Sequence, residues 1–200
     1  MKNLNIRLEK AINYNPLLWV FLLFICLYSF YGSINQGSYI YDGFHWGLVA
    51  SNANDFLNGK LPYKDFFVHY GFVTLLIQSI IYKIFSSIYS LIVLAAITYI
   101  ISIIIVFSII KKFTSNNYCY LFLSIVFFFQ PHVFYPWHTY FIFLFSTTGI
   151  AFYLRKNYLS YFSFGLCIQL AYLSSESFKV CSYLTVFSAI LILYFEKKII

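Results

Sequence analysis

Charged residues are scarce in this sequence. Only 10% of its 200 residues are Asp, Glu, Lys or Arg, whereas 62% are hydrophobic. A soluble domain is usually about one quarter charged, so this composition cannot supply a surface that faces water on all sides. The scarcity excludes an ordinary soluble domain and indicates that lipid is the surrounding solvent.

The usual cofactor and nucleotide motifs are also missing. The four cysteines have no CxxC spacing, which excludes a zinc-ribbon site and a disulfide framework. No Walker, HExxH, GxSxG or Rossmann pattern is present. We therefore expect no cofactor and no dedicated metal site, although a divalent metal is compatible with the chemistry considered below.

The net charge of +7 does not point to nucleic acid. The basic residues stand mostly in pairs between apolar runs instead of gathering along one soluble segment, so they are typical of membrane topology signals. We expect membrane lipid as a partner and no nucleic acid, and the sequence leaves the oligomeric state open.

Long apolar runs dominate the chain. They cover residues 14–33, 72–87, 90–110, 118–131, 138–154, 159–175 and 180–195. A membrane span needs about 20 residues, and the run at 72–87 is short and contains Gln78 and Lys83. No small-residue cleavage site follows the first run, so we interpret it as an uncleaved span.

The distribution of Lys and Arg decides whether residues 72–87 cross the membrane. If they lie along the outer surface and the N-terminus is cytoplasmic, nine basic residues are inside and four are outside; if they cross, the split is five to eight. Only the first arrangement obeys the positive-inside rule. The inner nine are Lys2, Arg7, Lys10, Lys111, Lys112, Arg155, Lys156, Lys197 and Lys198, and the outer four are Lys60, Lys64, Lys83 and Lys179.

The sequence therefore predicts an all-α, polytopic transmembrane bundle of about six spans, forming one domain over residues 1–200. Residues 33–88 form a long first outer loop with helices lying in the membrane interface. We expect a multi-pass protein of a bacterial inner, or cytoplasmic, membrane.

Within the outer loop, apolar residues recur at helical spacing from Phe44 to Leu57. Asp42 is placed to cap this helix and Gly59 to end it. We expect Trp46, Val49 and Ala53 to face the membrane, with Asn52 and Asp55 facing water. A second helix, at 72–85, is expected to lie along the outer surface.

Polar residues of the two outer loops are the candidate site. Asp42 is either a helix cap or a carboxylate that acts as a general base or metal ligand. Asp65 is either functional or a surface charge paired with Lys60 or Lys64. His45 and His69 in the first loop, with His138 in the second, are either interfacial anchors or donors to a phosphate.

The residues Tyr41-Asp42-Gly43, followed after about fifteen positions by Gly59-Lys60-Leu61-Pro62-Tyr63-Lys64-Asp65-Phe66-Phe67, carry a resemblance. This stretch resembles the first extracytoplasmic loop of GT-C superfamily membrane glycosyltransferases. The bacterial branch related to protein mannosyltransferases and lipopolysaccharide sugar transferases is the most similar. Gly43 and the segment 69–71 depart from the pattern of many members, which carry Glu and a Pro-Pro or Pro-Gly pair there.

The resemblance implies transfer of a sugar from a polyprenyl-phosphate donor to an acceptor outside the cytoplasm, such as a cell-envelope glycan, lipid or protein. It implies that Asp42 is the catalytic base. The expected substrate-binding residues are Asp65, His69, His45, Lys179 and His138. Because members of the superfamily have more spans, we expect the chain to be the N-terminal portion of a longer protein.

Other functions stay open at this point. The alternatives are a non-catalytic membrane protein, a transporter of lipid-linked envelope precursors, and an inactive fragment of a glycosyltransferase. The apolar runs contain almost no ionisable residues, which disfavours a transporter.

Overall fold

The computed structural model describes residues 15–39, 43–131, 134–135 and 137–175. These residues contain no β-strand, and the all-α class is confirmed for this part of the chain. The helices are α2 (Pro16–Tyr39), α3 (Gly43–Leu57), α4 (Phe72–Phe85), α5 (Ile88–Phe113), α6 (Asn116–Phe129), α7 (His138–Tyr153) and α8 (Tyr158–Ser174).

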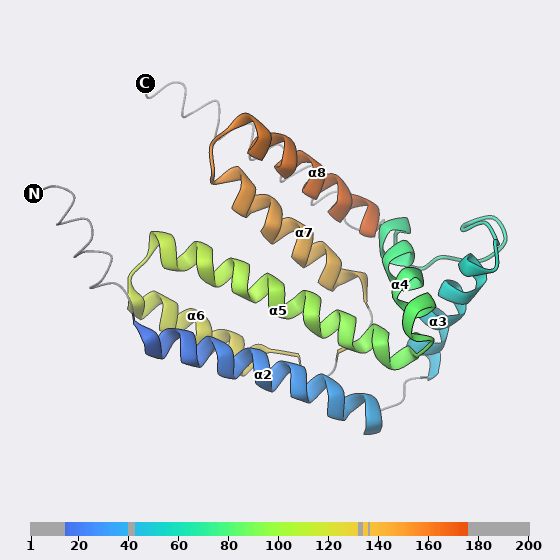
Figure 1. Ribbon diagram of the computed structural model, residues 1–200, viewed down its shortest axis with the longest axis horizontal. Coiled ribbons are helices and arrows are strands. Elements are labelled where there is room, and N and C mark those ends of the chain that lie inside the picture. The colour runs from blue at the N-terminus through green and yellow to red at the C-terminus, as the bar shows by residue number, and fades with distance from the viewer. Residues whose placement is uncertain (1–14, 40–42, 132–133, 136, 176–200) are drawn as a thin grey trace, which may run out of the picture.

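Helices α2, α5, α6, α7 and α8 lie side by side, whereas α3 and α4 lie across one end of this bundle (Figure 1). The central helix is α5, which contacts α2, α6 and α7, while α8 packs along α7. Helices α3 and α4 pack on each other where α2 ends and α5 begins. We call residues 43–85, comprising α3, the 58–71 loop and α4, the lid, and we call the opposite end of the bundle the open end.

Local caps explain where several helices begin and end. The Ser87 hydroxyl accepts a hydrogen bond from the Tyr89 amide at 3.2 Å at the start of α5. The Asn157 side chain accepts one from the Ser160 amide at 2.8 Å at the start of α8. Each cap satisfies an amide that has no partner within its own helix.

The core between α2, α5 and α6 is aliphatic and aromatic. Most of the hydroxyl groups buried in the helices donate back to carbonyls of their own helix, as Thr98 does to Ala95 and Ser102 does to Thr98. These bonds remove the cost of burying the hydroxyls. The buried cluster consists of Leu18, Leu22, Ile25, Ile103, Phe107, Cys119, Leu123 and Val126.

The outward faces of the bundle are apolar as well. Along α6 the exposed large side chains recur every three or four residues, and they are Tyr118, Leu121, Ile125, Phe128 and Phe129. The outer face of α8 carries Tyr158, Leu159, Phe162, Leu166 and Leu173. Apolar surface of this extent marks contact with lipid or with another protein.

Two of the described helices are long and apolar enough to cross a membrane. These are residues Pro16–Asn35 of α2, with mean hydropathy 2.1, and Ile88–Phe113, with mean hydropathy 2.8. Helices α6, α7 and α8 have 14, 16 and 17 residues, which is about 21 to 26 Å. The hydrocarbon core of a bilayer is about 30 Å thick. Of the six spans expected, α2 and α5 are therefore the two that meet the length criterion among the described residues.

The structure differs from the sequence expectation in two details. Helix α2 continues to Tyr39, beyond the expected span end at residue 33, because its hydrogen-bonded backbone does not need apolar side chains to continue. The apolar face of α3 does not face a membrane: Trp46, Val49 and Ala53 are buried against other parts of the protein.

Candidate functional site

The lid is fixed to the bundle through the apolar face of α3. Trp46 packs against Ile92, Ala95, Ala96 and Phe134, and Val49 packs against Tyr70 and Leu91. These contacts join α3 to the start of α5 and to the segment that leads into α7. Helix α3 is therefore held in one orientation by the body of the protein.

The end of α3 follows the expectation for Gly59. This residue has φ +82°, which favours glycine. Its amide donates to the Phe56 carbonyl at 3.1 Å, and the Lys60 amide donates to the Asp55 carbonyl at 3.1 Å. This pair of bonds is a Schellman motif, and it turns the chain away from the helix axis.

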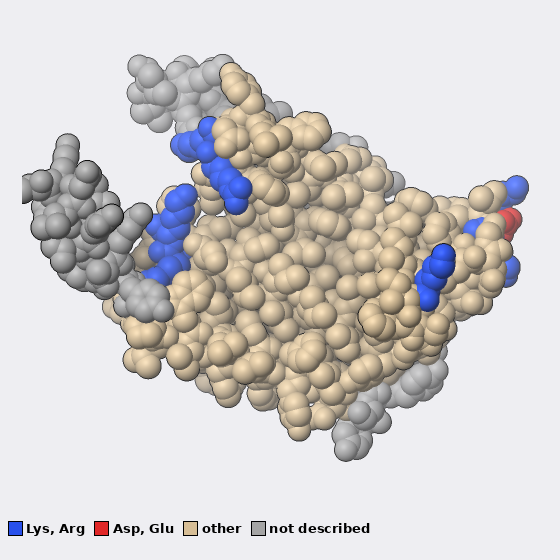
Figure 2. Space-filling model, in the orientation of Figure 1, with Lys and Arg blue, Asp and Glu red and all other residues tan. Residues whose placement is uncertain are grey.

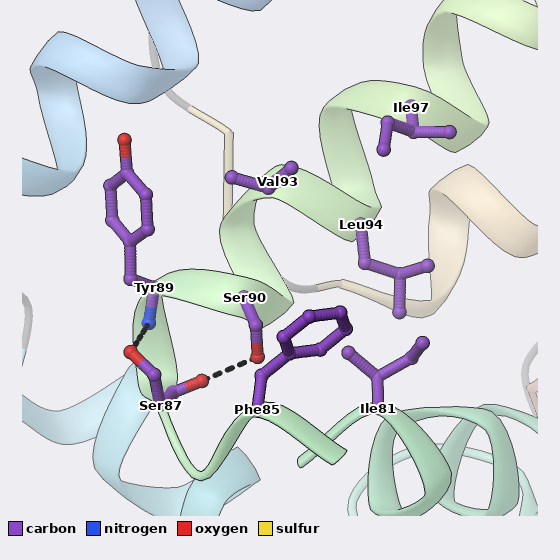
Figure 3. A pocket seen from close by; sticks show the side chains of 8 residues that line it. All are labelled: Ile81, Phe85, Ser87, Tyr89, Ser90, Val93, Leu94 and Ile97. Atoms are coloured by element: carbon purple, nitrogen blue, oxygen red, sulfur yellow. Dashed lines mark hydrogen bonds between the residues drawn. The ribbon is translucent and has the colours of Figure 1, made fainter.

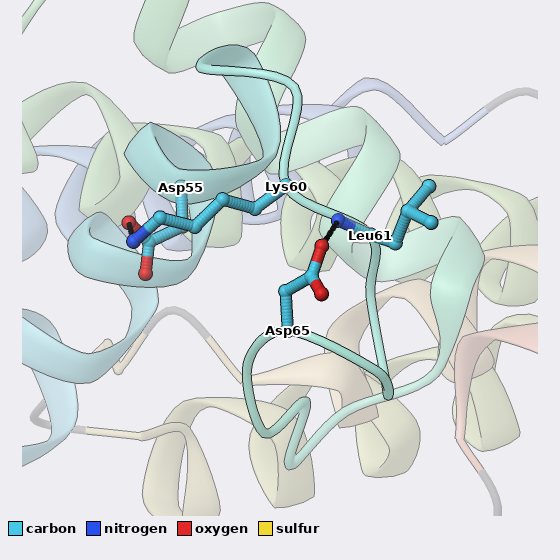
Figure 4. Close-up of polar contacts among 4 residues, drawn as sticks. All are labelled: Asp55, Lys60, Leu61 and Asp65. Carbon is cyan, nitrogen blue, oxygen red and sulfur yellow. Dashed lines mark hydrogen bonds and ion pairs between the residues drawn. The ribbon is translucent and has the colours of Figure 1, made fainter.

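Two carboxylates of the lid have local structural partners (Figure 4). Asp55 forms an ion pair with Lys60 at 2.8 Å, so the partner that was expected for Asp65 belongs to Asp55. Asp65 instead accepts a hydrogen bond from the Leu61 amide at 2.8 Å and closes the turn after α3. The geometry gives Asp65 a role in the loop and places Asp55 partly out of water.

The lid is also joined to the end of α8. The Gly71 amide and the Thr74 hydroxyl both donate to the Ser174 carbonyl, each at 2.9 Å. A Cβ atom on Gly71 would lie 2.2 Å from the Leu173 carbonyl oxygen and 2.6 Å from the Ser175 amide nitrogen. Backbone approaches this closely because residue 71 has no side chain.

Two of the expected histidines contact the ring of one tyrosine. The Tyr70 ring lies 4.8 Å from the His138 ring and 5.1 Å from the His69 ring, between ring centres. His138 is the first residue of α7 and follows the segment that connects α6 to α7. Burial, together with the nearby His69, lowers the pKa of His138, so its imidazole is held neutral more readily than in water.

The Nδ1 atom of His138 is buried and has no hydrogen-bond partner among the described residues. A buried polar atom without a partner costs about 1–3 kcal/mol. It lies at the amino end of α7, where the helix dipole and free backbone amides favour an anion. A ligand with a hydroxyl or phosphate group would satisfy it.

The third histidine lies among aromatic rings from the segment between α6 and α7. The His45 ring is 5.9 Å from that of Tyr135 and 6.1 Å from that of Trp137. Tyr135 and Trp137 are stacked at 5.0 Å with an interplanar angle of 15°. Flat aromatic surfaces beside polar groups are well suited to the faces of sugar rings.

An apolar cavity of about 390 Å³ lies between the end of α4 and the start of α5 (Figure 3). The hydroxyl groups at its edge, Ser87 and Ser90, are already bonded within the start of α5. The remaining lining is almost entirely hydrocarbon, and it consists of Ile81, Phe85, Tyr89, Val93, Leu94 and Ile97. The cavity can accept an apolar chain but offers little to a polar ligand.

The expected site is brought together only in part. His45, His69 and His138 lie at the lid end of the bundle, whereas the Asp65 carboxylate accepts a hydrogen bond from the Leu61 amide within its own turn. Asp42 and Lys179 lie outside the described residues. Among the described residues no group of three or more His, Cys, Asp or Glu is placed to hold a metal ion.

The sequence analysis named the segment 69–71 only as a departure from the family pattern and gave Tyr70 and Gly71 no role. Tyr70 is 7% exposed and contacts both histidines. The partners of these two residues lie at 138 and 174, so no local pattern identifies them. The only signal was their position between His69 and the start of the second lid helix.

Comparisons of this chain with protein-family models, with curated proteins and with solved structures find no match. Its function therefore has to be inferred from the chemistry of its own residues.

Proposed function

We propose that this chain is a multi-pass membrane protein whose lid faces the outside of the cell. The spans would be α2, α5, α6, α7 and α8, with residues 180–195 as the sixth, and α4 would rest in the outer interface. The apolar outer faces of α6 and α8 support this placement.

The charges support the same orientation. All the charged side chains of the described residues belong to the lid or to the open end, and Figure 2 shows Lys and Arg gathered at two opposite ends of the face in view. The open end carries Lys111, Lys112, Arg155 and Lys156, with no acidic residue among its described residues. The positive-inside rule assigns that end to the cytoplasm.

Thiol labelling tests this orientation. In a variant without its four native cysteines, we expect Ser86→Cys to react with an impermeant maleimide from outside the cell. Asn117→Cys, at the start of α6, should react only after the membrane is permeabilised. Both positions are exposed in the structure, so failure to react reflects sidedness. The opposite pattern at both positions would overturn the proposed orientation.

For activity, we propose transfer of a sugar from a polyprenyl-phosphate donor to an extracytoplasmic acceptor. The observation that carries this proposal is the contact of Tyr70, a residue of the lid, with both His69 and His138, together with a buried Nδ1 atom of His138 that lacks a partner in the described structure. The imidazoles would hold the donor phosphate and stabilise the leaving group. The apolar cavity beside α4 would suit part of the polyprenyl chain.

Asp42 is the proposed general base. It directly precedes α3 in the sequence, and α3 is fixed to α5 through Trp46. A base within hydrogen-bond reach of an acceptor hydroxyl takes up its proton as the new glycosidic bond forms, and the polyprenyl phosphate departs as the leaving group. The described part of the bundle holds no charged residue between its two ends, which disfavours a transporter with a site at the membrane midplane.

Substitution of Asp42 tests the activity. Asp42→Asn should lower the transfer of labelled sugar from a polyprenyl-phosphate donor by about 10²–10⁴-fold, the usual contribution of a general base. Asp55→Asn is the matched control, because Asp55 is paired with Lys60 and should retain most activity. Membrane levels of the two variants must be equal. Transfer by Asp42→Asn at the parent rate would remove Asp42 from the mechanism and leave it as a helix cap.

A further inference from the structure

A second cavity, of about 310 Å³, lies at the open end between α5 and α7. It lies at the opposite end of the bundle from the lid, and none of its lining residues belongs to the site described above. On the α5 side the lining is Ile104, Ile105, Ser108, Ile109, Lys112 and Phe113, and on the α7 side it is Ala151, Leu154 and Arg155. Its volume is at the lower end of the range of ligand-binding clefts.

The cavity is apolar over most of its length and cationic at one end. Ile104 and Lys112 are eight residues apart, which is about 12 Å along an α-helix. The Ser108 hydroxyl donates to the Ile104 carbonyl at 2.7 Å and so does not add a polar group to the wall. A ligand that fits this lining has an anionic head and an apolar tail that runs parallel to α5.

Lys112 and Arg155 are the two cationic residues of the lining, and no carboxylate of the described structure neutralises them. The only described carboxylates, Asp55 and Asp65, belong to the lid. The Lys112 ammonium lies over the Phe113 ring at 5.4 Å, and the Arg155 guanidinium lies over the Phe152 ring at 5.3 Å. Such contacts orient the charged groups and leave their N–H donors available for a phosphate.

We propose that this cavity binds an anionic phospholipid. Lys112 and Arg155 would contact its phosphodiester, and one acyl chain would lie along Ile105, Ile109 and Leu154. Basic pockets between helices on the cytoplasmic side of a membrane recognise lipid headgroups in this way. The proposal rests on the proposed membrane placement of the bundle, but it does not depend on sugar transfer.

The test compares two lipids that share acyl chains. The full-length chain, purified in detergent, is titrated with phosphatidylglycerol or with phosphatidylcholine, and the bound lipid is counted by native mass spectrometry. A basic residue near a membrane surface contributes about 1 kcal/mol, which is about fivefold in affinity. We expect Lys112→Gln with Arg155→Gln to weaken phosphatidylglycerol binding about 25-fold and to leave phosphatidylcholine binding unchanged.

Two further variants distinguish a built site from general surface charge. Lys64→Gln with Lys83→Gln removes the same charge from the lid and should change the binding by less than twofold. Ala151→Phe fills the cavity while keeping both cations, and it should also weaken phosphatidylglycerol binding. Lys112→Arg with Arg155→Lys should retain the preference, which guards against misfolding of the Gln variant.

Equal binding of the two lipids by the parent chain would overturn the proposal. An equal loss in the lid variant would do the same, since the cations would then act only as part of the overall charge. Neither result bears on the glycosyl-transfer proposal. Failure of the thiol-labelling pattern, with the lipid preference intact, would overturn the orientation and leave the lipid site in place.

Discussion

Replacing Gly71 by alanine tests whether the lid is held by the end of α8. Gly71 has φ −67° and ψ 160°, an extended conformation that alanine adopts easily, so backbone strain is not the issue. The issue is space, because the added Cβ would lie 2.4 Å from the Ser174 carbonyl carbon, and the other close atoms are also backbone. The helices would have to separate.

The expected cost follows from two effects. Overpacking of this kind usually costs about 1–3 kcal/mol. Separation would also lengthen the two hydrogen bonds that the Ser174 carbonyl accepts from Gly71 and Thr74, each worth about 0.5–1.5 kcal/mol. Together these give a loss of about 3 kcal/mol. For a chain of this size that corresponds to a fall in Tm of roughly 6–12 °C.

The assay is thermal unfolding of the purified chain in detergent, followed by tryptophan fluorescence. Gly165→Ala is the matched control, because a Cβ there meets nothing within 4 Å and residue 165 lies inside α8. Alanine in a helix interior is favoured over glycine by about 0.5–1 kcal/mol, so this variant should melt at or slightly above the parent Tm. If Gly71→Ala melts within about 2 °C of the parent, α8 does not hold the lid.

Two further predictions concern the lid and the histidine pair. Asp65→Ala removes the acceptor of the Leu61 amide and should lower the free energy of unfolding by about 1 kcal/mol. Asp65→Asn keeps an acceptor oxygen and should melt near the parent Tm. Loss of sugar transfer in a fully stable Asp65→Asn variant would instead show that Asp65 has a chemical role. Because the folded state lowers the pKa of His138, the unfolded chain binds more protons, so the Tm should fall as pH drops below about 6.5. His138→Gln should reduce that fall, and an unchanged pH dependence of Tm would contradict the assignment.

Features that depend on neighbours in the sequence were predictable. The helix at Phe44–Leu57 and its end at Gly59 follow from apolar spacing and from one residue that tolerates positive φ. The helical class follows from long apolar runs that carry few strand or turn signals. Helices form through hydrogen bonds between residues four apart, and caps act within a few residues, so these signals are local.

The partner of a given carboxylate was not predictable. Lys60 lies between Asp55 and Asp65 in the sequence, five residues from each, and both carboxylates were within reach of its side chain. The Schellman turn directs Lys60 back toward α3, where it pairs with Asp55. Asp65 then bonds the Leu61 amide. Gly59 sets the direction of the backbone after α3, and this direction decides which of the two carboxylates Lys60 pairs with.

The sequence by itself determined a helical, lipid-compatible chain, with its polar residues gathered in the connections between apolar runs. Only the tertiary structure placed Gly71 against Ser174, and Tyr70 against His138. It also joined Lys112 and Arg155 in one cavity. The physical reason is that these contacts join segments about 40 to 100 residues apart. Their formation depends on how whole helices pack, and the hydrophobic and packing forces that bring helices together do not specify partners residue by residue.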